Sequence, residues 1–383
     1  MTSPPNSLPE ISPPGVPSPP PPAENPPWTI GDVLVISVVA LVAITIFSLA
    51  ALWFGSHSAL FRGMPARQLM RDPLLIIPAQ FAAYMVLVLF MYLVVRRAYG
   101  YRFLATVRWN WPRGTWIGFL ALGCIVAIAG QLLSALLPIP KSLPIDQFFH
   151  SPADAWMMAS FGIAVAPFVE ELFFRGFLYP VAMRGFYGVF SRPKDLRNLG
   201  IVVIVIAVWG ELTFRLRGEF LHLASGLALL FAVACLALII TQRRKRYLPG
   251  VFAGIILACW GPAAAHLDRS SMLAITVALF LVGALFWGLA YLEFSMSLAS
   301  RTAVAAAIGV TAFLFALLHS AQLGNAWGPL VVLFVVGAVL TAVRAFTQSV
   351  ASSMLVHIGY NLTLFGLLFV ASGQFQHLER VRG

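Results

Sequence analysis

The chain has 383 residues, of which 60% are hydrophobic and 10% charged, and its mean hydropathy is +0.87. Soluble globular domains carry roughly 25% charged residues, so this composition excludes a water-soluble fold, a disulfide scaffold and a wholly disordered chain. A net charge of +11 would suggest nucleic acid in a soluble protein. In a membrane protein the same excess of Lys and Arg is typical of cytoplasmic loops. We therefore expect a multi-pass membrane protein that does not bind nucleic acid.

The first 27 residues include twelve prolines and contain no Lys, no Arg and no aromatic residue. A segment of this composition cannot bury a core, so residues 1–27 are predicted to form a disordered, Pro-rich tail. Trp28 follows at the start of the first apolar run. Aromatic residues gather at the membrane interface, and we expect Trp28 to lie there.

Apolar runs follow the tail, and most have the roughly 20 residues that a helix needs to cross a bilayer. They lie at about 30–54, 74–95, 115–138, 153–184, 199–214, 221–241, 248–266, 271–294, 302–322, 327–346 and 349–372. None alternates between polar and apolar residues as the strands of a membrane β-barrel do. The predicted fold class is therefore all-α, a polytopic transmembrane helical bundle of about 9–11 spans.

Ionisable residues inside these runs are the first candidates for function, because each costs about 2.5–3.5 kcal/mol at the centre of a membrane helix. Their sharpest concentration is EELFFRG at 170–176, and Pro167 predicts a kink just before it. Glu171 and Arg175 are four residues apart, so they share a helical face and can form an ion pair. Glu170 points about 100° away from Glu171. Two adjacent carboxylates with one base leave an excess negative charge, which favours a function over helix locking alone.

Two later runs carry further polar residues. The sequence FALLH ends at His319, and HIGYN runs from His357 to Asn361. His357 and Asn361 are four residues apart and so lie on one face of a helix. A single intramembrane histidine is more often a packed, hydrogen-bonded residue than a catalyst. Together with Glu170, however, these residues place one carboxylate, two imidazoles and one amide in three spans, a set suited to hydrolysis.

EELFFRG, FALLH and HIGYN resemble the EExxxR, FxxxH and HxxxN motifs of the CPBP family. This family contains type II CAAX prenyl proteases and bacteriocin-processing or immunity (Abi-like) proteins. The resemblance implies an intramembrane endopeptidase that hydrolyses a peptide bond with water activated by a glutamate. The catalytic residues that it implies are Glu170 and His319 for the water, and His357 and Asn361 for the oxyanion. Glu171 and Arg175 would support the first motif.

The resemblance covers roughly 155–190 and 300–370, and residues 191–300 intervene where the family usually has a short connection. This departure suggests an insertion of further transmembrane helices between the motifs. We therefore expect a disordered tail (1–27), N-terminal transmembrane helices (28–150), a first catalytic-motif helix (151–190), inserted transmembrane helices (191–300), second catalytic-motif helices (301–373) and a C-terminal tail (374–383).

Two other interpretations of these residues stay open. Glu170, His319 and His357 would supply the two-His-one-Glu ligand set of a catalytic zinc, although the sequence HExxH is absent. We prefer the glutamic mechanism and expect no cofactor, with zinc as the alternative. The second interpretation is a non-catalytic membrane scaffold, immunity protein or transporter that uses the same charges. The expected partners are a peptide or protein substrate and the lipid bilayer, and the expected location is a bacterial cytoplasmic membrane.

Overall fold

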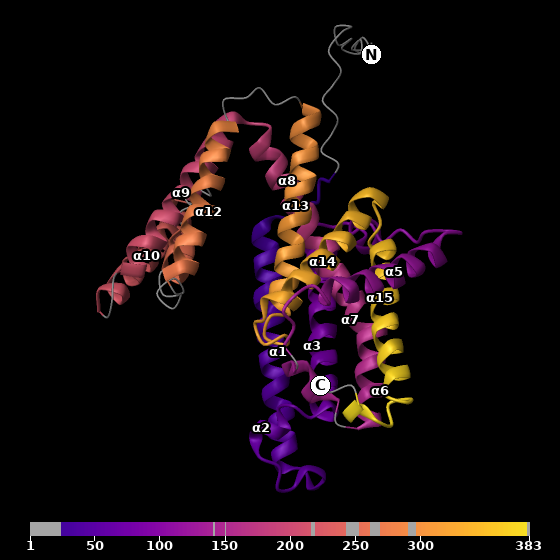
Figure 1. Cartoon of the computed structure of the whole chain (residues 1–383). Coiled ribbons are helices and arrows are strands. Elements are labelled where there is room, and N and C mark those ends of the chain that lie inside the picture. Colours follow the sequence, from indigo (N-terminus) through magenta and orange to yellow (C-terminus); the bar gives the residue numbers. More distant parts are fainter. Residues whose placement is uncertain are drawn as a thin grey trace, which may run out of the picture. The chain divides into compact units, whose positions relative to one another are not determined.

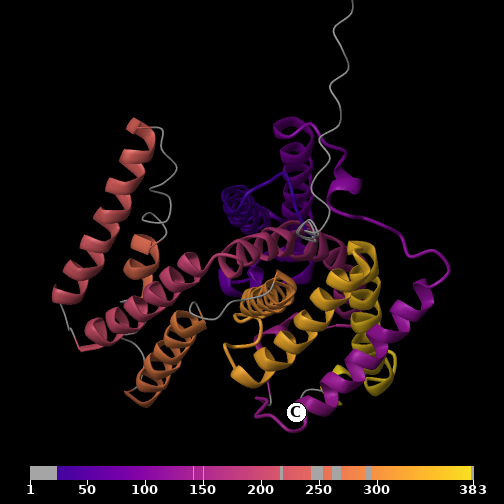
Figure 2. The same ribbon diagram turned by 90° about the horizontal axis from the view of Figure 1, so that it is seen from above.

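The structure is a computed structural model that describes residues 24–140, 142–149, 151–215, 219–242, 253–260, 269–289 and 296–380. In these residues every regular element is helical, and no strand is present. The chain separates into two compact units. The first comprises Met1–Phe186 with Arg301–Gly383, and the second comprises Tyr187–Ser300 (Figures 1 and 2). The all-α class predicted from the apolar runs is confirmed.

The first unit is built from helices that precede and follow the second unit in the sequence. Its α-helices, of which α8 and α13 cross the boundary between the units, are α1 (Ile30–His57), α2 (Ala66–Leu69), α3 (Pro73–Leu93), α4 (Phe103–Thr106), α5 (Trp116–Ser134), α6 (Pro152–Ser160), α7 (Ala166–Glu171), α8 (Tyr179–Phe190), α13 (Met296–Leu318), α14 (Trp327–Thr347) and α15 (Val350–Ala371). Its 3-10 segments are η1 (Ala59–Phe61), η3 (Pro144–Phe148) and η7 (Leu378–Arg380), and its π-helical segments are η2 (Val94–Ala98), η4 (Phe161–Val165) and η5 (Leu172–Leu178).

Eight helical segments in the described part of the chain are long and apolar enough to cross a membrane. They are Ile30–His57, Pro73–Ala98, Trp116–Ser134, Pro152–Phe190, Arg197–Arg215, Ala299–Leu318, Trp327–Thr347 and Val350–Ala371. The protein is therefore a multi-pass integral membrane protein. The helices α10 (Glu219–Gln242) and α12 (Arg269–Leu289) correspond to two further predicted runs, and most of the predicted run at 248–266 lies outside the described residues.

The long run that contains the two adjacent glutamates forms one helical segment of 39 residues, Pro152–Phe190. Pro167 lacks a backbone N–H, and its ring crowds the carbonyl group four residues earlier. The helix accommodates it by widening into the π-helical turn η4 just before, and it widens again in η5 just after Glu171. The irregularity predicted at Pro167 therefore takes the form of two wide turns that flank α7, the short helix that ends in Glu170 and Glu171.

Helices α5 and α15 pack closely against each other through two glycines. A Cβ atom on Gly359 would collide with the carbonyl oxygen of Leu120, and one on Gly123 would collide with the carbonyl oxygen of Val356. Membrane helices approach this closely where small residues face each other. The contact fixes α15, the helix that carries His357, against α5 (Figures 1 and 2).

The residues just before α1 pack against the first unit. Trp28 is fully buried, its ring stacks on that of Phe177 with the centroids 4.5 Å apart, and its Nε1 donates a hydrogen bond to the carbonyl oxygen of Phe177 at 3.1 Å. Arg184 donates hydrogen bonds to the carbonyl oxygens of Pro26 and Trp28 at 2.6 and 2.8 Å. Trp28 is thus a core residue of the first unit, and its predicted depth at the membrane interface stays a prediction.

Glu24 forms a buried cluster of charged side chains near the start of α1. Its carboxylate is 3% exposed and accepts hydrogen bonds from both terminal nitrogens of Arg344, at 2.8 and 3.3 Å. Nε of Arg108 lies 3.5 Å from the same carboxylate. Glu24 and Pro26, both within the tail predicted at 1–27, therefore contact the bundle, and the residues before Glu24 lie outside the described ones.

The segment after α15 folds back on α6. Phe375 and Leu378 are buried and form one apolar cluster with Ala155. The ring of Trp156 meets that of Phe375 edge-on, with the centroids 5.3 Å apart. The described part of the C-terminal tail predicted at 374–383 is thus packed against helices of the first unit.

Besides the end of α8 and the start of α13, the described residues of the second unit form α9 (Pro193–Arg215), α10 (Glu219–Gln242), α12 (Arg269–Leu289) and a short helical stretch at 253–260. Helices α9 and α12 pack where Gly283 faces the carbonyl oxygen of Gly200. On α9, Glu211 accepts hydrogen bonds from Nη2 and Nε of Arg215 at 2.7 and 2.9 Å. This ion pair is partly exposed, in contrast to the charges of the first unit.

Candidate active site

The second of the two adjacent glutamates, Glu171, is fully buried and fully paired. Its Oε1 accepts hydrogen bonds from Nη1 of Arg175 at 2.8 Å and from Nδ1 of His357 at 2.9 Å. Its Oε2 accepts a hydrogen bond from the hydroxyl of Ser353 at 2.5 Å. A buried carboxylate is tolerated when its charge is paired and its oxygens accept hydrogen bonds. The ion pair predicted between Glu171 and Arg175 is confirmed.

Arg175 is also fully buried, and it connects three helical elements. Its Nε donates to the hydroxyl of Thr341 at 3.3 Å, and its Nη2 donates to the carbonyl oxygen of Gly337 at 3.1 Å. The guanidinium lies 4.6 Å from the centre of the Phe315 ring, the first residue of FALLH. A desolvated cation over an aromatic ring gains about 2 kcal/mol. Arg175 therefore ties η5 to α13 and α14.

Glu170 has much weaker contacts than its neighbour. The hydroxyl of Tyr84 donates to its Oε1 at the long distance of 3.4 Å. Nε2 of His319 lies 3.9 Å from Oε1, and Nε2 of His357 lies 3.9 Å from Oε2. The carboxylate is 12% exposed. Distances of 3.9 Å are too long for hydrogen bonds, but one water molecule can contact both groups across such a gap.

Each of the two histidines uses one ring nitrogen to fix its orientation. Nδ1 of His319 lies 2.8 Å from the carbonyl oxygen of Phe315, and because a carbonyl oxygen only accepts, this nitrogen carries the hydrogen. Nδ1 of His357 is held in the same way by the carboxylate of Glu171. Both Nε2 atoms therefore face Glu170. The structure brings together three of the four residues predicted to be catalytic.

Asn361 lies on the same face of α15 as His357, but its contact is with another part of the long helix. Its Nδ2 donates a hydrogen bond to the carbonyl oxygen of Gly162 at 2.6 Å. Gly162 lies in the π-helical turn η4, where the helical hydrogen-bond pattern is altered. One amide hydrogen of Asn361 is thus committed to stabilising this turn, which leaves the second amide hydrogen for any role at the site.

Glu170, His319 and His357 are also the three residues that would hold a zinc ion. Ligands about 2.0–2.1 Å from one ion in a tetrahedral site are roughly 3.3 Å from each other, whereas the two carboxylate–imidazole distances are 3.9 Å. Within the described residues, no three His, Cys, Asp or Glu side chains are spaced to hold a metal ion. The donor types and the hydrogen-bonded Nδ1 atoms nevertheless suit zinc. The types of donor atom therefore fit zinc, but the atoms lie farther apart than the ligands of a bound zinc ion.

The sequence analysis missed the residues that support this cluster from outside the motifs. Ser353 and Thr341 bond to Glu171 and Arg175, and Tyr84 bonds to Glu170. Ser353 could have been predicted from the sequence, because it lies one helical turn before His357 and therefore on the same helix face. Tyr84 could also have been identified, because it follows the polar residue Gln80 by four positions in a largely apolar span. Residues at that spacing lie on one face of a helix, and polar residues in membrane helices usually face the interior of the bundle.

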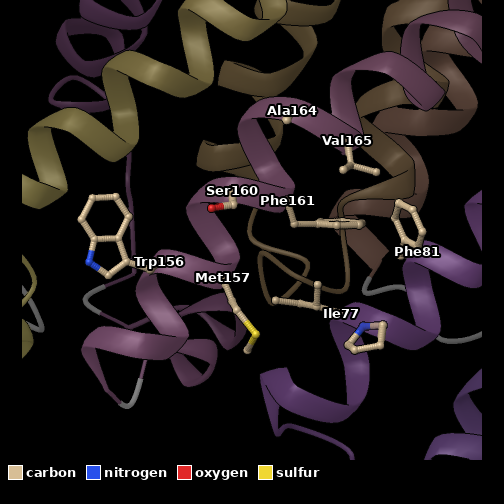
Figure 3. Close-up of a pocket in the computed structure, with 9 residues that line it drawn as sticks. Ile77, Phe81, Trp156, Met157, Ser160, Phe161, Ala164 and Val165 are labelled. Carbon is tan, nitrogen blue, oxygen red and sulfur yellow. The ribbon is translucent and has the colours of Figure 1, made fainter.

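An apolar pocket of about 660 Å³ lies between α3 and the first part of the long helix (Figure 3). Ile77 and Phe81 line it from α3, and Phe161 lines it from η4, with the hydroxyl of Ser160 as a polar group. The ring of Phe161 stacks on the ring of Tyr84, with the centroids 5.7 Å apart. Phe161 and Tyr84 therefore lie between the pocket and Glu170.

Comparison with known families matches part of the chain. Residues 269–363 match the family of type II CAAX prenyl endopeptidase Rce1-like proteins. The matched segment contains FALLH and HIGYN, and EELFFRG precedes it in the sequence. The predicted resemblance to type II CAAX prenyl proteases is thereby confirmed for the segment that contains these two motifs. Neither a curated protein nor a solved structure matches the chain.

Proposed function

We propose that this membrane protein is an intramembrane endopeptidase of the CAAX type, in which Glu170 activates a water molecule. The observation that carries the proposal is the contrast between two neighbouring carboxylates. Glu171 is saturated with short hydrogen bonds, whereas Glu170 is partly exposed and faces two imidazole nitrogens across gaps of 3.9 Å. A membrane protein that kept this charge for packing alone would pair it, because an unpaired charge in a membrane helix is costly.

In the proposed reaction, a water molecule between Glu170 and the histidines gives a proton to the carboxylate as its oxygen attacks the carbonyl carbon of the peptide. The tetrahedral intermediate carries a negative oxygen. When the C–N bond breaks, Glu170 returns the proton to the leaving amine nitrogen, so the base is regenerated. A positioned carboxylate acting in this way contributes about 10²–10⁴ to the rate.

The hydrogen bonds of the histidines support different roles for them. His319 carries its hydrogen on Nδ1, so its neutral form presents Nε2 as an acceptor that orients the attacking water. His357 has its Nδ1 hydrogen committed to Glu171, so its Nε2 can donate to the oxyanion only as the imidazolium. A charged His357 would also balance the site, because Glu170 and Glu171 would then face two cations, Arg175 and His357. We assign Asn361 a supporting role at the oxyanion through its second amide hydrogen.

The family name points to a prenylated peptide as substrate, and we propose that the apolar pocket receives the apolar group of such a substrate. Its walls are Ile77, Phe81 and Phe161. Burial of apolar surface contributes roughly 25 cal/mol per Å², so a prenyl chain would gain affinity here. A bacterial origin is not part of this proposal and stays a prediction.

A zinc-dependent reaction is the alternative, favoured by the convergence of two Nε2 atoms and one carboxylate. A zinc ion in this position would polarise the substrate carbonyl and lower the pKa of a bound water. Glu170, His319 and His357 would be its ligands. The two mechanisms make opposite predictions about chelators and metal content.

The test uses the purified protein with a synthetic peptide ending in a CAAX sequence, prepared with and without a prenyl group on the cysteine. The expected result is cleavage of the prenylated peptide with a lower KM, unchanged by exhaustive chelation, and less than one tightly bound metal ion per chain. Stoichiometric zinc in the active protein, with chelator inactivation reversed by added zinc, would establish the metal mechanism instead. Absence of cleavage of either peptide would count against a CAAX-type substrate.

A further inference from the structure

Helix α3 contributes a pair of polar side chains that reaches the candidate base from outside the three motifs. Gln80 and Tyr84 are four residues apart on one face of α3. Nε2 of Gln80 donates a hydrogen bond to the hydroxyl oxygen of Tyr84 at 3.1 Å, and the Tyr84 hydroxyl donates to Oε1 of Glu170 at 3.4 Å. The result is a chain of hydrogen bonds that runs from α3 to the carboxylate.

The direction of this chain follows from the donors and acceptors present. A phenol has one hydrogen to donate, whereas the side-chain nitrogen of glutamine only donates. Because Gln80 supplies a hydrogen to the phenol oxygen, the hydrogen of Tyr84 is left for Glu170. A carboxylate accepts such a bond most strongly when it is ionised, the form that acts as a base.

The ring of Tyr84 is also held by its surroundings. Phe161 stacks on it, and Phe161 belongs to the same long helix as Glu170. Figure 3 shows Phe161 extending from the long helix toward Phe81 of α3. The phenol therefore has little freedom to rotate away from the carboxylate.

We infer that Tyr84 is a positioning residue for Glu170. This inference rests on the proposed function and adds to it a residue from a different helix. Oε1 of Glu170 faces His319 and Oε2 faces His357, so the plane of the carboxylate must be fixed for both oxygens to keep these neighbours. Tyr84 fixes that plane through Oε1, and Gln80 fixes the hydroxyl of Tyr84.

The test is Tyr84→Phe, which removes the hydroxyl and keeps the ring against Phe161. We expect kcat to fall about 3- to 10-fold with KM and melting temperature unchanged, because a long hydrogen bond to a charged group is lost. Gln80→Met should lower kcat less, and the double variant should be no slower than Tyr84→Phe alone. Tyr92→Phe is the matched control, because this tyrosine of α3 faces Phe103 and is 42% exposed.

A second measurement separates this inference from the proposed function. In infrared difference spectra, a carboxylate band that disappears in Glu170→Gln should shift in Tyr84→Phe and stay in place in Tyr92→Phe. That result supports the contact even if no peptide is cleaved. The inference is overturned if the band is the same in Tyr84→Phe and the wild type. It is also overturned if Tyr84→Phe keeps more than half of the wild-type kcat while Glu170→Gln is inactive. A fall in the kcat of Tyr84→Phe that only follows a fall in its melting temperature overturns the inference as well.

Discussion

Two Glu–Arg pairs with the same helical spacing lie in different parts of the molecule. In the first unit Glu171 and Arg175 are joined at 2.8 Å, and in the second unit Glu211 and Arg215 are joined at 2.7 Å. The first pair is fully buried, whereas the side chains of Glu211 and Arg215 are 28% and 64% exposed. Spacing and distance are alike, so burial and the surrounding donors make the difference.

The buried pair exists because other helices complete its hydrogen bonds. Ser353 and His357 from α15 supply donors to Glu171, and Thr341 from α14 accepts from Arg175. The pair on α9 lies at the end of a candidate span, where long side chains reach water or headgroups. The i,i+4 spacing therefore predicts that an ion pair forms, but not how much it contributes to the stability of the fold. That contribution comes from packing.

The largest effect on activity is expected at Glu170, which belongs to neither ion pair. Glu170→Gln should lower kcat by about 10²–10⁴, because the general base is lost while the side chain keeps its shape. The melting temperature in detergent should stay at the wild-type value, since among the described residues Glu170 accepts one weak hydrogen bond, at 3.4 Å. Peptide cleavage by the purified variant is the measurement. Activity above about 10% of wild type would remove Glu170 from the role of base.

Breaking the buried pair should mainly damage stability. Glu171→Ala or Arg175→Ala leaves a buried charge without its partner, which costs about 3–5 kcal/mol. Both variants should melt at a clearly lower temperature in detergent, and Glu171→Ala should also lose activity because His357 loses the group that orients it. Unchanged melting of both variants would mean that the pair does not carry the stability assigned to it.

The buried cluster before α1 offers a third test of the same principle, away from the site. Glu24→Gln removes the charge that Arg344 and Arg108 share. The expected loss is about 3 kcal/mol, the lower end for a broken buried pair, because the side-chain oxygen of glutamine can still accept a hydrogen bond from Arg344. In contrast to Glu171→Ala, this variant should keep its kcat once folded. A fall in kcat at full stability would show that the Glu24 cluster communicates with Glu170.

Much of the fold could be predicted from the sequence because helix formation in a membrane is a local requirement. The run that contains EELFFRG, for example, had to satisfy its backbone hydrogen bonds within itself, and it forms one helical segment. The Glu171–Arg175 pair followed from spacing on that helix. The convergence of His319 and His357 on Glu170 could be predicted only as a resemblance, since nothing in the spacing of three separate spans brings them together.

The contacts that the sequence did not reveal join residues far apart in the chain. Tyr84 meets Glu170 across 86 positions, and Arg344 meets Glu24 across 320. Trp28 stands at the start of the first span in the sequence, and that position did not reveal its contacts with Phe177 and Arg184. Such contacts depend on how the helices pack, and side-chain periodicity contains no information about the partner helix.

The smallest expected effect is at the exposed pair. Glu211→Ala should change stability by about 0.5 kcal/mol or less, because an exposed i,i+4 pair gains little Coulomb energy and holds two long side chains in one geometry. It is the matched control for Glu171→Ala, since both changes remove a glutamate bonded to an arginine one turn later. Melting curves of the two variants under the same conditions give the comparison directly, and high salt should reduce the small effect further. Equal losses in the two variants would mean that burial does not set the weight of these pairs, and the structural role given to Glu171 would have to be withdrawn.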